Sequence, residues 1–114
     1  MSEQILWAIR NGDLDQLKAL KFDANELLMA GRYPLHVAAD YGHVDVGDYL
    51  IQQGANVNQL DKHGISPLLC AIFEHHTQFV KLLLKHGADK NTKMPDGRTC
   101  YDVAESDEIR QLLK

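Results

Sequence analysis

The side chains best suited to chemistry in this sequence are six histidines and two cysteines. Cys70 with a histidine could form a nucleophile and its base, but Cys70 falls among the inward positions of a helical pattern. His75 and His76 are adjacent, so they would point in different directions on a helix and make a poor metal pair. No phosphate loop, nucleophile elbow, zinc-protease motif or calcium loop occurs. We therefore expect no catalytic residue, no metal and no cofactor.

The composition is that of an ordinary soluble domain, with 114 residues of which 45% are hydrophobic and 25% charged. Met1 to Gln4 are neither basic nor followed by a long apolar run, so secretion and membrane insertion are unsupported. Cys70 and Cys100 lack a close Cys-x-x-Cys spacing, which favours free thiols over a disulfide or metal pair. We expect a monomer in the cytoplasm, with the nucleus as a second location.

The net charge of −4 comes entirely from the first half of the chain. Residues 1–57 carry eight acidic and four basic side chains, whereas residues 58–114 carry eight of each. This balance argues against nucleic acid as a partner. It favours a basic protein surface, because an acidic patch accelerates encounter with one. The alternative is a solvated face that serves only solubility.

A period of 33 residues organises the chain. Nine positions of one segment match nine positions of the next at this offset, namely Gly31, Pro34, Leu35, Ala38, His43, Leu50, Gly54, Ala55 and Asn58 with Gly64, Pro67, Leu68, Ala71, His76, Leu83, Gly87, Ala88 and Asn91. A third copy begins at Gly97. This period, with a turn and two helices per unit, resembles the ankyrin-repeat family, whose units bury their apolar faces only by stacking. We predict an all-α ankyrin solenoid of about four helix-turn-helix repeats with short hairpin loops.

The predicted domain covers residues 1–114 and contains two full and two capping repeats. The N-terminal cap is expected at 1–30, full repeats at 31–63 and 64–96, and the C-terminal cap at 97–114. Gly12 aligns with Gly42 at a spacing of 30 residues, not 33. We therefore expect a shortened or irregular hairpin over residues 21–30.

Several residues are predicted to begin or end helices. Pro34 suits a first helical turn, Ser66 is a good N-cap, and Thr99 with Asp102 reads as a capping box. Gly42 and Gly54 are expected to end helices in the left-handed conformation. His75 stands where Gly42 stands one repeat earlier, so a positive φ is predicted there at a cost of about 1 kcal/mol. A contact of His75 with a partner is the alternative to surface variation.

His36 occupies the place of a histidine that ankyrin repeats use for structural hydrogen bonds, and we interpret it as structural. The usual threonine partner is replaced by Tyr33.

The hairpin tips and the exposed ends of the first helices form the predicted binding face. Its aromatic members are expected to act as anchors within a charged surround, although Trp7 aligns with Val37 and could equally be half-buried. Asp40, Asp45, Asp48 and Glu74 would supply the acidic complement to a basic partner. The predicted partner-binding residues are Trp7, Arg10, Arg32, Tyr33, Asp40, Tyr41, Asp45, Lys62, His63, Phe73, Glu74 and His75.

Along its whole length the chain also resembles the myotrophin family of ankyrin-repeat proteins. The matching motifs are Trp7-Ala8, Asn11-Gly12-Asp13-Leu14-Asp15, Gly31-Arg32, Pro34-Leu35-His36, Gly54-Ala55-Asn56, Asp61-Lys62-His63, Val80 to Leu84, Gly87 to Lys90 and Pro95-Asp96-Gly97. The resemblance implies binding to the heterodimeric actin capping protein and steric inhibition of its attachment to filament barbed ends, so that the ends grow. Reversing Asp40 and Glu74 to lysine is expected to weaken such binding without unfolding the chain. A regulator of a Rel-type (NF-kappa-B type) transcription factor or of a kinase is the alternative.

Overall fold

The computed structural model describes residues 2–28 and 31–114 of the chain, and it is built from helices. Their order is α1 (Ser2–Asn11), α2 (Leu14–Ala19), α3 (Pro34–Tyr41), α4 (Val44–Gln52), α5 (Pro67–Phe73), α6 (Thr77–Lys85), α7 (Cys100–Val103) and α8 (Asp107–Leu112). No strand occurs in the described ranges, where the isolated bridge between Lys93 and Thr99 is the nearest approach to one. The predicted all-α ankyrin solenoid is confirmed.

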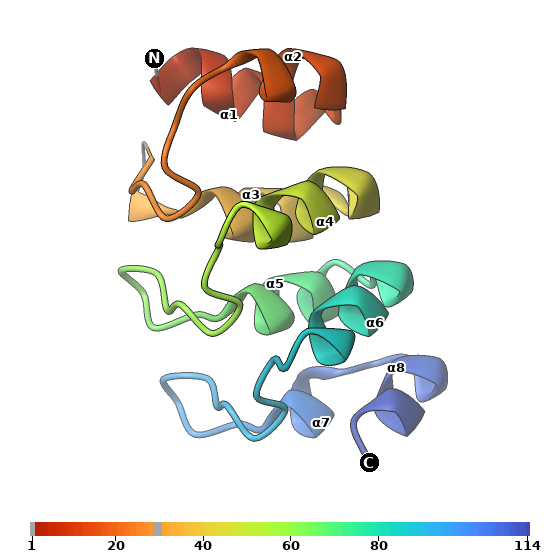
Figure 1. Cartoon of the computed structure of the whole chain (residues 1–114). Helices are drawn as coiled ribbons and strands as arrows, with labels where there is room; N and C mark the ends of the chain where they lie inside the picture. Colours follow the sequence, from red (N-terminus) through yellow and green to blue (C-terminus); the bar gives the residue numbers. More distant parts are fainter. Residues whose placement is uncertain (1, 29–30) are drawn as a thin grey trace.

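The helices stack in two rows (Figure 1). α1, α3, α5 and α7 contact one another in succession, and α4, α6 and α8 do the same in the second row. Three loops project to one side of the stack, one before each of α3, α5 and α7. The core lies between the rows and between neighbouring repeats, where Ile9, Leu50 and Phe79 are fully buried. Since each repeat hides its apolar face against the next, the molecule is elongated, at 38 × 24 × 20 Å.

The shortening of the first unit lies in its second helix, which corrects the expectation of a shortened hairpin. α2 has six residues, whereas α4 and α6 have nine each. The hairpin bond from Leu28 N to Arg32 O is 2.7 Å long, and Asp61 N to Ile65 O repeats it at 2.9 Å, 33 residues later. The 33-residue register therefore already holds at Leu28. Met29 and Ala30, also within that expectation, lie outside the described residues.

Asparagine side chains join each of the first two hairpin segments to the following repeat. Asn25 Nδ2 donates to Gly54 O at 2.9 Å, and Asn25 Oδ1 accepts from Asn56 N at 2.8 Å. Asn58 makes the same pair of bonds to Gly87 O and Asp89 N, at 3.2 and 2.7 Å. These bonds satisfy backbone groups that the loops leave outside helices, and they fix the spacing between repeats.

The predicted helix ends are present. Pro34 opens α3, and Gly42 closes it with φ 73°. Ser66 Oγ accepts from Leu69 N at 3.2 Å, and Thr99 with Asp102 forms a reciprocal capping box at the start of α7. Gly54 has φ 99° but lies two residues beyond α4, whose C-cap is Gln53.

Candidate protein-interaction surface

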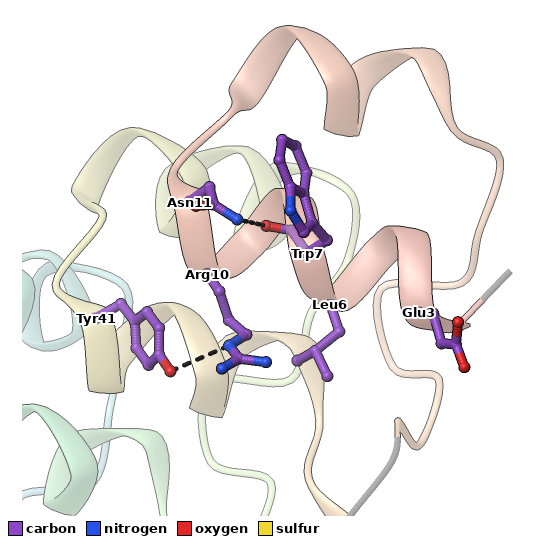
Figure 2. A pocket seen from close by; sticks show the side chains of 6 residues that line it. All are labelled: Glu3, Leu6, Trp7, Arg10, Asn11 and Tyr41. Carbon is purple, nitrogen blue, oxygen red and sulfur yellow. Dashed lines mark hydrogen bonds between the residues drawn. The ribbon is translucent and has the colours of Figure 1, made fainter.

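A hollow lies beside the first helix of the first repeat. Glu3, Leu6, Trp7 and Arg10 are spaced so that they share one face of α1. Together with Asn11 and with Tyr41 at the end of α3, they line a hollow of about 540 Å³ (Figure 2). Two adjacent repeats thus contribute to one concave site, and the aromatic and apolar groups in it are flanked by charges of both signs.

Two hydrogen bonds hold this hollow in shape. Arg10 Nε donates to Tyr41 Oη at 3.1 Å, and the Arg10 guanidinium carbon lies 5.8 Å from the Tyr41 ring centroid. Asn11 Nδ2 donates to Trp7 O at 2.7 Å and so satisfies a carbonyl near the end of α1. The bond to Tyr41 ties the predicted residue Arg10 to the neighbouring repeat (Figure 2).

Trp7 is exposed rather than half-buried, with 55% of its surface accessible. The equivalent Val37 is only 4% exposed. Within the described chain α1 packs against α2 and α3, whereas α3 packs against α1, α4 and α5, so the α1 position has fewer neighbours to cover it. On its other side Trp7 borders a second hollow of about 300 Å³, lined also by Glu3, Gln4 and Gln16. Its indole is therefore available to a partner from two directions.

Arg32 and Asp40 form an ion pair, with 26% of each side chain exposed. Arg32 Nη2 also donates to His36 O at 3.2 Å and lies 3.6 Å from Cys70 Sγ. Burial by itself lowers the pKa of Arg32, but the hydrogen bond and charge of Asp40 raise it above its ordinary value. The charge of Asp40 is therefore already balanced within the chain, and a lysine there would face Arg32. Reversing Asp40 is consequently not a clean test of partner binding.

His36 has the structural role predicted for it. Its ring is fully buried, and Nε2 lies 2.7 Å from Ile65 O in the next repeat. Burial lowers the pKa of His36, against the opposing effect of that carbonyl. Nδ1 has no hydrogen-bond partner among the described residues. Tyr33 makes no side-chain cap to α3 and instead places its ring centroid 5.8 Å from that of His36.

The remaining predicted residues are spread along the solenoid. Phe73 and Glu74 are exposed at the end of α5, and His75 follows with φ 58° and Nε2 3.8 Å from Glu105 Oε2. The positive φ predicted for His75 is thus confirmed, while a partner contact there stays a prediction.

Three further predicted residues lie away from the hollow. Lys62 and His63 are exposed on the second hairpin, where the Lys62 stem packs over Gly31 so closely that a Cβ on Gly31 would be 2.2 Å from Lys62 Cδ. Asp45 lies in the first turn of α4, in the second row of helices. The structure therefore brings Trp7, Arg10 and Tyr41 together but not Asp45.

Sequence reasoning missed Glu3 and Leu6 as lining residues of the hollow. Their separation from Trp7 and Arg10 by three and four positions is a signal that could have found them, because such residues share a helix face.

Comparison with known proteins agrees with this architecture. Residues 5–94 match the family of ankyrin repeats in three copies. Myotrophin of Xenopus tropicalis is 46% identical over 114 aligned residues that cover 97% of both chains. This chain belongs to the myotrophin family of ankyrin-repeat proteins. Protein phosphatase 1 regulatory subunit 27 of mouse is 29% identical over 93% of this chain and 73% of its own. The human BCL-6 corepressor-like protein 1 is 33% identical over 80% of this chain but only 5% of its own length.

The myotrophin-family chain is a protein-interaction module, because its surface offers concave faces between stacked repeats. Across residues 2–28 and 31–114, no group of three or more His, Cys, Asp or Glu side chains is placed to hold a metal ion. None of the helices in the described ranges has the length and apolarity needed to cross a membrane.

Proposed function

We propose that this chain binds the heterodimeric actin capping protein and sterically keeps it off filament barbed ends, so that those ends continue to grow. The observation that carries the proposal is the match to myotrophin along 97% of both chains. A likeness that covers the whole solenoid includes the surfaces between repeats, whereas a match to one or two repeats would support the fold alone. The proposed place of action is the cytoplasm.

The contact is proposed to centre on the hollow beside α1. Trp7 provides a large aromatic surface at low entropic cost, and Tyr41 is held in place by Arg10. Glu3 in the hollow and the exposed Glu74 at the end of α5 supply negative charge along the same row of first helices. These groups suit a partner that presents basic side chains around an apolar centre.

The test is a barbed-end elongation assay with pyrene-labelled actin and capping protein, in which this chain is titrated. Dose-dependent recovery of the elongation rate is expected, with no effect of the chain on actin alone. Trp7→Ala should shift the titration to at least tenfold higher concentration, as for a central aromatic anchor. Tyr101→Ala is a matched control, because Tyr101 is 43% exposed on α7, at the opposite end of the row.

A charge test uses Glu74→Lys rather than Asp40→Lys, because Glu74 makes no ion pair among the described residues. This substitution should weaken inhibition and flatten its salt dependence while leaving the urea midpoint unchanged. Absence of any recovery by the unmodified chain at tens of micromolar would reject the proposal. Mass spectrometry of proteins retained by the chain would then decide whether a Rel-type transcription factor or a kinase is retained instead.

A further inference from the structure

Two leucines occupy equivalent exposed positions on successive hairpins. Leu27 immediately precedes Leu28, and Leu60 immediately precedes Asp61, and these two following residues make the equivalent hairpin bonds of 2.7 and 2.9 Å. Leu27 is 57% exposed and Leu60 is 46% exposed. The neighbouring Leu28 is only 4% exposed, so the core already has its apolar side chain from this hairpin. Leu27 is therefore not needed for burial.

The two hairpins that carry these leucines touch each other. Lys62 N donates to Gly31 O at 3.4 Å, and the Lys62 stem covers Gly31. A single exposed leucine is common on protein surfaces and needs no explanation. Two at the same register on adjoining hairpins instead form a continuous apolar stripe, which we call the hairpin stripe (Leu27 and Leu60). The loops that carry it lie side by side in Figure 1.

The stripe continues into positive charge at the third hairpin. Lys93 is the equivalent residue there, one position before Met94, whose N–H closes the hairpin at 2.8 Å from Arg98 O. Lys93 is exposed and makes no ion pair among the described residues, and the same holds for Lys62 on the second hairpin. The row thus reads apolar, apolar, basic along the solenoid, opposite in sign to the acidic groups assigned to the capping-protein contact.

We propose that the hairpin stripe and Lys93 bind an amphipathic helical segment of a partner protein that presents two apolar side chains followed by an acidic one. Stacked helices lie about 8–10 Å apart, so the three hairpin positions repeat at about that distance. A helix advances about 10.5 Å in seven residues and returns to nearly the same face. Apolar side chains at i and i+7 and an acid at i+14 therefore meet Leu27, Leu60 and Lys93 in order, as helix-in-groove recognition requires.

The probe is a phage-displayed library of helical peptides with randomised positions on one face, selected on the full chain and counter-selected on the L27S/L60S variant. Enriched peptides are expected to carry the apolar, apolar, acidic order at seven-residue spacing. Their synthetic versions should bind the double variant at least tenfold more weakly. Lys93→Glu should weaken them about threefold to tenfold, and a lysine at i+14 of the peptide should restore the loss.

Controls separate this surface from folding and from the proposed capping-protein contact. The double variant should keep the urea midpoint of the unmodified chain, because both leucines are exposed. It should also keep full activity in the actin elongation assay, and Tyr101→Ser should leave peptide binding unchanged. Two results would overturn the proposal: enriched peptides that bind L27S/L60S as tightly as the unmodified chain, or no enrichment at all. Concentration-dependent dimerisation that the double variant abolishes would also overturn it, in favour of a second copy of this chain on the stripe.

Discussion

His76 Nε2 lies 2.8 Å from the backbone oxygen of Asp40, and His43 Nε2 makes the same contact with Arg10 O at 2.9 Å, one repeat earlier. Each ring crosses from the start of a second helix to the end of the preceding repeat's first helix. The rings lie directly over Gly42 and Gly12, where an added Cβ would come within 2.5 and 2.8 Å of the ring Nδ1. These glycines are thus required both by their positive φ and by the histidine of the next repeat.

The same relationship explains why His75 can replace the glycine in the third repeat. The helix that follows in the next unit, α8, begins after Ser106, whose Oγ caps it by accepting from Ile109 N at 3.4 Å. No histidine stands at that N-cap, so the ring that would collide with a Cβ is missing. His75 therefore carries only the backbone cost of φ 58°.

Gly42→Ala is expected to lower the free energy of unfolding by about 2–4 kcal/mol, because it combines backbone strain with displacement of the His76 ring and loss of its bond. Gly54→Ala is the control: its φ of 99° is less favourable for alanine, but nothing lies within 4 Å of the added Cβ. It should cost about 1 kcal/mol. Urea unfolding measures both. Equal losses in the two variants would show that the ring contact contributes nothing.

Gly47 is a second position where packing decides the residue. It lies within α4, and an added Cβ would be 2.6 Å from the Phe79 ring and 3.1 Å from Leu82 Cδ2 on α6. Helix propensity alone would make Gly47→Ala stabilising by about 1 kcal/mol. We expect a net loss of about 1–2 kcal/mol, since overpacking costs more. In a Phe79→Leu background the same substitution should become neutral or stabilising, and a double-mutant cycle would detect this coupling.

The stability of the chain is expected to depend on the protonation of His36. Burial lowers the pKa of His36 in the folded state below its ordinary value of 6.5, so the unfolded chain binds more protons in this range. Its contribution is therefore complete above about pH 6.5 and declines as the pH falls toward the folded pKa, by at most about 1.4 kcal/mol per pH unit. Urea unfolding from pH 7.5 to 5.5 should show this decline. His36→Gln should remove its His36 component, and an unchanged pH dependence would contradict the assignment.

Both cysteines are expected to resist thiol reagents in the folded protein. Burial raises the pKa of Cys70 to about 12 and that of Cys100 to about 11, so almost no thiolate exists at pH 8. A pulse of iodoacetamide followed by peptide mapping should label neither residue at the rate of a free thiol. Cys100 should react first, because α7 packs against fewer helices than α5, which carries Cys70. Immediate labelling of Cys70 would refute this prediction.

Much of the fold could be predicted from the sequence, because its signals are local and repeated. The 33-residue period predicted the stacked helix pairs, and Pro34, Ser66 and Thr99 marked helix starts that the structure confirms. The missing three residues of the first unit were assigned to the wrong segment. Spacing between glycines measures only the total length, whereas the hydrogen bond of Leu28 shows that α2 is the short element.

The candidate surface was predictable only in part. Helical spacing alone determined that Trp7 and Arg10 share a face, and the repeat register alone determined that Tyr41 ends the next first helix. Only the tertiary structure decided that Trp7 is exposed, that Asp40 is paired with Arg32, and that a histidine is tolerated at position 75. Exposure, ion pairing and steric room depend on side chains from neighbouring repeats, about 30 residues away along the chain, which a local pattern does not contain.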